Sequence, residues 1–100
     1  MNIQKMMKQA AKMQEQVTAS LAEKTVEASV GGGKVTVTAN GLGDVMGIKI
    51  AKEVVDPEDV EMLEDLILSG VKQAIIQGKE LAQGEMGKLT AGLGLPPGML

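Results

Sequence analysis

The chain has 100 residues and a formal net charge of −3, and it contains no Phe, Tyr, Trp, His, Cys or Arg. The missing residue types remove the usual general base near neutral pH, the thiolate nucleophile and the common zinc ligands. They also remove the aromatic stacking and bidentate arginine contacts with which many proteins read bases. We therefore expect no enzyme activity, no metal, no cofactor and no small-molecule substrate.

The size is that of one domain, whose core must be built from aliphatic residues and methionine. Apolar residues make up 44% of the chain, and eight residues are methionine. Because so short a chain has a thin margin of stability, it would gain from dimerising. The lack of cysteine fits a reducing compartment, and the sequence has neither a signal peptide nor an apolar run of about 18 residues. We expect a cytoplasmic protein with no membrane partner.

Residues 3–24 are predicted to form a long amphipathic helix. Apolar residues recur there at helical spacing with no Gly or Pro between them, at Ile3, Met6, Met7, Ala10, Met13, Val17 and Leu21. At about 100° per residue, Lys5, Lys8 and Lys12 fall on the opposite side. The predicted helix therefore has a basic face at its beginning.

Residues 25–50 change to the period of two that is typical of β-strands. Three alternating apolar sets follow one another: Val26, Ala28 and Val30; Val35, Val37 and Ala39; Met46, Ile48 and Ile50. Gly31-Gly32-Gly33 predicts the first hairpin turn. Asn40-Gly41 predicts the second, because both residue types tolerate positive φ. The three strands should form an antiparallel meander with one apolar and one polar face.

Asp56-Pro57 predicts the start of a second long helix, with Asp56 as its N-cap. The main apolar stripe of this helix comprises Val60, Leu63, Ile67, Val71, Ala74, Ile75 and Leu81. A second apolar set is expected to project from roughly the opposite side and to contact another subunit; it comprises Met62, Leu66 and Ile76. A ridge of small residues should let a neighbouring backbone approach closely, at Gly70, Ala74, Gly78 and Ala82.

The element order is therefore α-β-β-β-α, an α+β fold in which two long helices flank a three-stranded sheet. Residues 1–88 are predicted to form a single domain and residues 89–100 a tail rich in Gly, Pro and Leu, within which Gly92–Gly98 cannot continue a helix. The apolar residues of this tail could pack across a partner subunit; they are Leu89, Leu93, Leu95, Met99 and Leu100.

The basic face of the first helix has two interpretations. Lys5, Lys8 and Lys12 span about 10 Å of helix, and no acidic residue precedes Glu15. The ordinary interpretation is a solvated face. The other is a patch that contacts phosphates and is doubled by the symmetry of a dimer, an arrangement that positions a protein on DNA and specifies little sequence.

An acidic run covers the start of the second helix, at Asp56, Glu58, Asp59, Glu61, Glu64 and Asp65. Acidic residues at a helix N-terminus interact favourably with the helix dipole, which explains the first turn. No EF-hand spacing supports a metal site here. The run could also repel DNA and so orient the protein, or dock a basic protein.

Taken together, these segments resemble the YbaB/EbfC family of bacterial nucleoid-associated proteins over nearly the whole chain. The first two matching pieces are Met7-Lys8-Gln9-Ala10 with Lys12-Met13-Gln14, and the glycine turn with Val35, Val37, Asn40-Gly41, Gly43, Val45, Ile48 and Ile50. The next three are the segment Asp56–Ile67, Met86-Gly87-Lys88-Leu89-Thr90, and Leu95-Pro96-Pro97-Gly98-Met99. Family members often carry Arg, which this chain lacks.

The resemblance implies a tweezer-like homodimer whose protruding helices engage double-stranded DNA in the nucleoid. It places Lys5, Lys8 and Lys12 at the DNA, with Lys88 as a further candidate. The expected function is to bind duplex DNA with low sequence specificity and to alter its conformation, with effects on gene expression, nucleoid organisation or DNA protection. The alternative is a protein-interaction adaptor that uses the acidic helix 56–65 and the apolar tail and binds no DNA.

Overall fold

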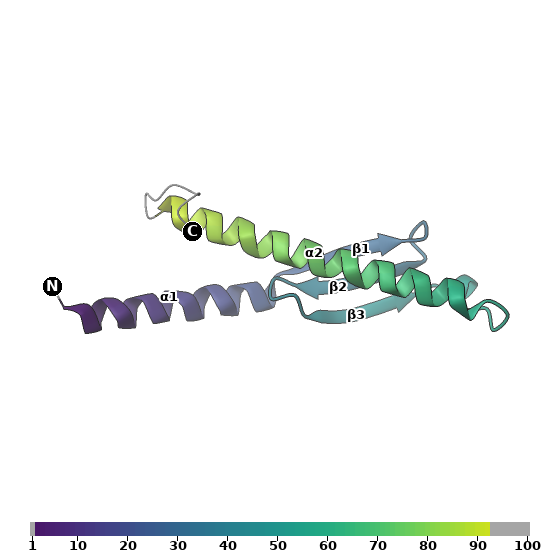
Figure 1. Cartoon of the computed structure of the whole chain (residues 1–100), viewed down its shortest axis with the longest axis horizontal. Coiled ribbons are helices and arrows are strands. Elements are labelled where there is room, and N and C mark those ends of the chain that lie inside the picture. Colours follow the sequence, from purple (N-terminus) through teal and green to yellow (C-terminus); the bar gives the residue numbers. More distant parts are fainter. Residues whose placement is uncertain (1, 93–100) are drawn as a thin grey trace.

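The computed structural model describes residues 2–92, and the side chains of residues 2–88. Figure 1 shows the elements in chain order: α1 (Ile3–Glu23), β1 (Thr25–Val30), β2 (Val35–Asn40), β3 (Val45–Ile50), the short 3-10 helix η1 (Lys52–Val54) and α2 (Val60–Gly92). The strands form one antiparallel sheet in the order β1-β2-β3. The predicted α-β-β-β-α fold is confirmed.

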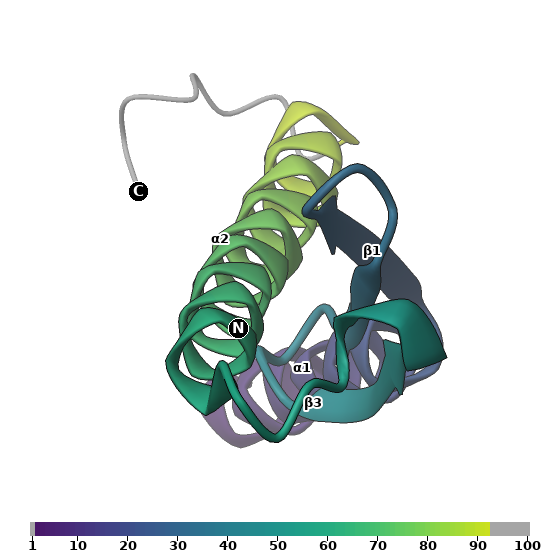
Figure 2. The same cartoon turned by 90° about the vertical axis from the view of Figure 1, so that its right-hand side faces the viewer.

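The core lies between α2 and the inner face of the sheet. Val35, Val37 and Ala39 of the central strand are completely buried, and Ala28 pairs with Val37 on the same face. Because directly opposed residues of an antiparallel pair point to the same side, the alternating apolar residues of β1 and β2 line one surface under α2. Figure 2, which looks along the molecule, shows α2 lying over β1 and the sheet. The predicted apolar and polar faces are confirmed for these two strands.

The third strand differs from the expectation in its register. Val45 pairs with Ala39, Ile48 with Val37 and Ile50 with Val35, with an irregularity between Thr38 and Ala39. This bulge places Val45 rather than Met46 opposite Ala39, so the predicted set of Met46, Ile48 and Ile50 is wrong at its first member. An extra residue at a bulge shifts the alternation by one, which the sequence pattern could not reveal.

The small-residue ridge of α2 packs on the sheet of its own chain. A Cβ atom added at Gly70 would lie 2.8 Å from Cγ2 of Val37, and one added at Gly78 would collide with the carbonyl oxygen of Asn40. Ala74 between them is completely buried. The predicted close approach of a backbone is therefore confirmed, and the backbone is that of β2.

The N-cap of α2 differs from the predicted one. The helix begins at Val60, and the Oδ1 atom of Asp59 accepts a hydrogen bond from the backbone N–H of Met62 at 3.2 Å. Asp56 instead accepts from the N–H of Glu58 at 2.9 Å, in a turn before the helix. The N-cap predicted at Asp56 is therefore about one turn too early, because an Asp side chain stabilises a turn as readily as a helix terminus.

The first hairpin turn is confirmed and the second is corrected. Gly31, Gly32 and Gly33 all have positive φ, as the turn between β1 and β2 requires. Between β2 and β3 the positive φ occurs at Gly43, with a value of 85°. Asn40 is instead the last residue of β2, so the predicted positive φ at Asn40 and Gly41 is wrong.

The chain forms an elongated body of 68 × 23 × 16 Å. Figure 1 shows α1 projecting beyond the end of the sheet, with the C-terminal part of α2 pointing to the same side. Helix α2 runs through Gly84 and Gly87 to Gly92, past the expected domain boundary at residue 88. The remainder of the predicted tail, residues 93–100, lies outside the described residues. Within residues 2–92, no helix combines the length and apolarity needed to cross a membrane.

Replacing Gly78 with Ala should destabilise the fold by about 1–3 kcal/mol, the usual cost of overpacking. The obstacle is the backbone oxygen of Asn40, which cannot rotate away. Gly84→Ala is the matched control, because nothing lies within 4 Å of its added Cβ. This control should gain about 0.5–1 kcal/mol from helix propensity. Urea unfolding measures the free energy of unfolding of both variants. Equal changes in the two variants would contradict the packing assigned to Gly78.

Candidate nucleic-acid interface

The basic face occupies the part of α1 that projects from the fold. Asn2 caps this helix, since its Oδ1 accepts from the backbone N–H of Lys5 at 3.3 Å. Every residue from 2 to 16 is exposed, including Lys5, Lys8 and Lys12. Among the described residues, no carboxylate forms an ion pair with any of these three lysines. Their charges are therefore available to an anionic partner.

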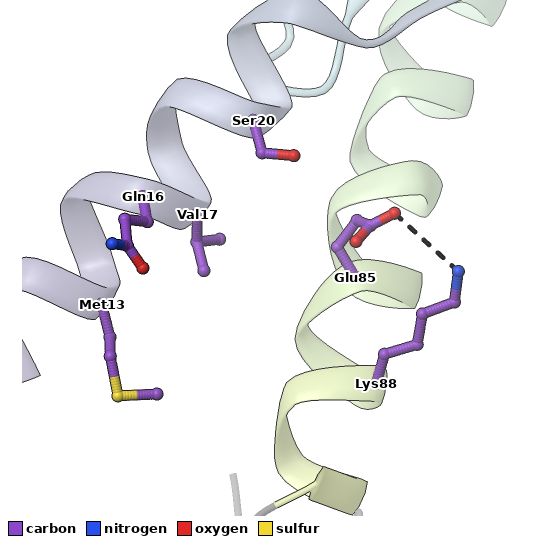
Figure 3. Close-up of a pocket in the computed structure, with 6 residues that line it drawn as sticks. All are labelled: Met13, Gln16, Val17, Ser20, Glu85 and Lys88. Carbon is purple, nitrogen blue, oxygen red and sulfur yellow. Dashed lines mark ion pairs between the residues drawn. The ribbon is translucent and has the colours of Figure 1, made fainter.

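The opposite side of α1 faces α2 across an open apolar groove. One part of this groove has a volume of about 400 Å³ and is lined by Ala10, Met13, Gln14, Val17, Thr18, Leu21 and Met86. An adjoining part of about 330 Å³ carries polar groups as well and is lined by Met13, Gln16, Val17, Ser20, Glu85 and Lys88 (Figure 3). Helix α1 thus separates an apolar side, which faces the groove, from a basic side that faces away from it.

The orientation of α1 is set by a junction at Asn40 and Gly41. Asn40 is only 3% exposed, and its Oδ1 accepts from the N–H groups of Leu42 and Asp44, both at 3.0 Å. Its Nδ2 donates to the carbonyl oxygen of Ala22 at 3.4 Å. Gly41 donates its N–H to the carbonyl oxygen of Leu21 at 2.9 Å. The last turn of α1 is therefore attached directly to the turn between β2 and β3.

Gly41 is required at this junction for close approach. A Cβ atom there would lie 2.8 Å from Cδ2 of Leu21 and 3.0 Å from the carbonyl oxygen of the same residue. Leu21 itself is buried. The Asn-Gly pair was correctly placed at a chain reversal, but the sequence offered no sign that it also anchors the basic helix.

An ion pair links the base of α1 to the distal half of α2. The Nζ atom of Lys24 lies 2.5 Å from Oε1 of Glu85, and the Nζ atom of Lys88 lies 4.0 Å from the same oxygen. The hydrogen bond from Lys24 is the main reason that the pKa of Glu85 lies below its ordinary value of 4.5, with smaller contributions from the charges of Lys24 and Lys88. Lys88, a further candidate for DNA contact, thus lies beside a carboxylate at the mouth of the groove (Figure 3).

Among the three candidate interface residues of α2, Leu66 differs from Met62 and Ile76 in its burial. Met62 and Ile76 are exposed, as expected for residues that project away from the sheet. Leu66 is half-buried and packs against the core of its own chain. Its Cδ2 atom lies 2.9 Å from where a Cβ of Gly31 would be. The expectation that Leu66 projects away from its own sheet is wrong, because the β1–β2 turn reaches round to its side of the helix.

The structure leaves an apolar surface of β3 uncovered. Val45, Ile48 and Ile50 share the inner face of the sheet with the buried residues of β2, yet they are 40%, 46% and 38% exposed. Helix α2 packs on β1 and β2 and barely reaches β3. The alternation in β3 predicted an apolar face, but only the path of α2 shows that this face is left uncovered.

The acidic run does not form a metal site within the described part of the chain. No group of three or more carboxylates there is arranged to hold an ion. Asp56 and Asp59 accept backbone hydrogen bonds at the start of α2, in agreement with the helix-terminus explanation of these charges.

A small α+β domain that holds an unpaired lysine face on a projecting helix has the geometry of a protein that contacts a polyanion. The chain matches the YbaB/EbfC DNA-binding family over residues 1–93. It is 54% identical to a nucleoid-associated protein of Acetivibrio thermocellus over 98% of this chain and 89% of that protein. A nucleoid-associated protein of Ruminiclostridium cellulolyticum is 52% identical over 98% of this chain and 88% of its own length.

The chain therefore belongs to the YbaB/EbfC DNA-binding family of bacterial nucleoid-associated proteins. The fold is also similar to the crystal structure of an uncharacterized protein from Helicobacter pylori, with a TM-score of 0.65 and 21% sequence identity. That match covers 81% of this chain and 94% of the other. At this identity it supports the architecture alone.

Replacing Glu85 with Gln should lower the melting temperature at neutral pH. A carboxylate whose pKa is lowered by folding stabilises the fold above its unfolded pKa, and this stabilisation is lost as the pH falls through the folded pKa. The difference between Glu85→Gln and the unchanged protein should therefore shrink on acidification. Glu80→Gln, an exposed residue on the same helix with no ion pair among the described residues, is the control. A pH-independent difference for Glu85→Gln would disprove the ion-pair explanation.

Proposed function

We propose that this protein binds double-stranded DNA as a homodimer with low sequence specificity, in the nucleoid of the bacterial cytoplasm. Altered DNA conformation is the expected result, with effects on nucleoid organisation, gene expression or DNA protection. The observation that carries the proposal is the exposed lysine face of α1, at Lys5, Lys8 and Lys12, which forms no ion pair among residues 2–88 of a chain that belongs to a DNA-binding family. Exposed lysines attract the phosphate backbone irrespective of base sequence.

Low specificity follows from the side chains that the protein brings to the DNA. Lysine is a compact point charge on a flexible stem, whereas arginine presents a planar fork that matches the edge of guanine. The chain has no arginine and no aromatic residue. The contacts of the protein with DNA should therefore depend on the position of the phosphates and the shape of the duplex rather than on the identity of the bases.

A second subunit is supported by the apolar face of β3. Val45, Ile48 and Ile50 would cost free energy if they stayed in water, and a second copy could cover them with the same face. Two-fold symmetry would also present two lysine faces to one duplex. Met62 and Ile76, the exposed members of the candidate set on α2, remain candidates for a further contact between subunits.

Replacing Lys5, Lys8 and Lys12 with Glu should abolish DNA binding and leave the dimer intact. With about six phosphate contacts per dimer, the unchanged protein should show a slope of log K against log salt of about −5. Fluorescence anisotropy with a labelled duplex, over a range of salt concentrations, measures the affinity for DNA and the slope of log K against log salt.

The matched control replaces Lys49, Lys72 and Lys79 with Glu, which changes the net charge by the same amount at exposed positions away from α1. This control should keep most of the affinity. Equal loss in both variants would mean that overall charge, and not the face of α1, drives binding. A salt-independent affinity would refute the electrostatic mechanism. Absence of binding at physiological salt, with stoichiometric recovery of a basic protein, would favour the adaptor function.

Replacing Ile48 with Asp should convert the dimer into monomers, because a charge would be buried in the proposed interface. Lys49→Asp is the control on the adjacent position, whose side chain points to the other face of the sheet. Light scattering coupled to size-exclusion chromatography measures the mass. The monomeric variant should also show about half the salt slope. A dimer that survives Ile48→Asp would place the interface elsewhere.

A further inference from the structure

The two ends of the Asn40 side-chain amide differ in the strength of their hydrogen bonds. Its Oδ1 accepts two backbone hydrogen bonds of 3.0 Å from the turn between β2 and β3. Its Nδ2 has two longer contacts, 3.4 Å to the carbonyl oxygen of Ala22 and 3.7 Å to Sδ of Met46. A thioether sulfur is a weak acceptor. The amide is therefore held least firmly at the end that contacts α1.

Met46 brings this weak acceptor to the surface of the protein. The residue is 60% exposed, whereas Asn40, to which its sulfur is hydrogen-bonded, is only 3% exposed. The side chain of methionine is also flexible and polarizable. A small reagent in the solvent can therefore reach a sulfur atom that is bonded to a buried polar group.

Oxidation of methionine to the sulfoxide places an oxygen atom on this sulfur. In the reaction with a hydroperoxide, a lone pair of the sulfur attacks the terminal peroxide oxygen, the O–O bond breaks and an S–O bond forms. The proton of the hydroperoxide passes to the other oxygen, which leaves as water or as an alcohol. The sulfur is oxidised by two electrons and the peroxide is reduced by two.

Exposure alone does not single out Met46, since Met7 is 67% exposed. Oxidation on the apolar side of α1 would only make that surface more polar. At Met46 the new oxygen would have the N–H group of Asn40 beside it. The hydrogen bond to a buried amide therefore gives oxidation at Met46 a specific structural effect.

We propose that Met46 is a site of reversible oxidation by hydroperoxides, and that its sulfoxide oxygen replaces the sulfur as the acceptor of the Asn40 side-chain N–H. An N–H···O bond of the usual length of about 2.9 Å needs only a small displacement of the sulfur, because the oxygen lies between sulfur and nitrogen. The amide is then held firmly, with its second N–H directed at Ala22 of α1. Methionine sulfoxide reductases reverse the change. The proposal concerns the free protein and does not depend on DNA binding.

The side-chain amide signals of asparagine test the proposal in the full-length protein. The chain contains two asparagines, Asn2 and Asn40, so nitrogen-15 labelling of this residue type gives a simple spectrum. Once the methionine methyl signals show that hydrogen peroxide has oxidised Met46, one Asn40 side-chain proton should move downfield. Met62→Leu, which removes another exposed methionine, should show the same movement, and Met46→Leu should not. An unmoved Asn40 signal, or an equal movement in Met46→Leu, would overturn the proposal.

Met46→Gln tests the new hydrogen bond without an oxidant, because its side-chain carbonyl oxygen corresponds in position to the sulfoxide oxygen. This variant should show the downfield Asn40 signal and should melt about 2–6 °C above Met46→Leu, the effect of one hydrogen bond in a domain of this size. A melting temperature no higher than that of Met46→Leu would contradict the proposed bond. Methionine sulfoxide reductase should restore the original spectrum of the oxidised protein. A shifted Asn40 signal that persists after reduction would refute reversible oxidation as its cause.

Discussion

The attachment of the basic helix depends on the junction at Asn40 and Gly41. Asn40 is a buried polar residue, and its side chain is hydrogen-bonded to the last turn of α1 and to the turn between β2 and β3. The carbonyl oxygen of the same residue lies against Gly78 of α2. Asn40, at the end of β2, therefore contacts both helices. Because α1 has few other contacts, this junction decides where its lysines point.

The lack of aromatic residues has a structural consequence beyond the limits it sets on chemistry. The core contains Val and Ala where larger side chains often pack, and small residues in α2 let it lie close to β2. Helix α2 packs on β1 and β2 and barely reaches β3. The exposed apolar residues of β3 and of α1 are the reason that further packing is expected.

Helix α1 combines two roles on two sides. Its lysines lie opposite the groove, so an anionic partner can bind without disturbing the packing of the apolar side. The ion pair between Lys24 and Glu85 joins the residue that follows α1 to α2, and Glu85 also lines the groove. Lys24 is therefore engaged in an ion pair within the fold, whereas Lys5, Lys8 and Lys12 form no ion pair with any residue in the described part of the chain.

The sequence by itself determined the order of elements, the two faces of β1 and β2, the glycine turn and the basic face of α1. These features follow from periodicity and from backbone freedom, which are local properties of the chain. Only the tertiary structure decided the bulge before Ile48, the burial of Leu66 and the role of Asn40, because each depends on which distant segment lies alongside and not on spacing along the chain. The cap at Asp59 is a local choice between two neighbouring Asp residues that the sequence pattern did not resolve.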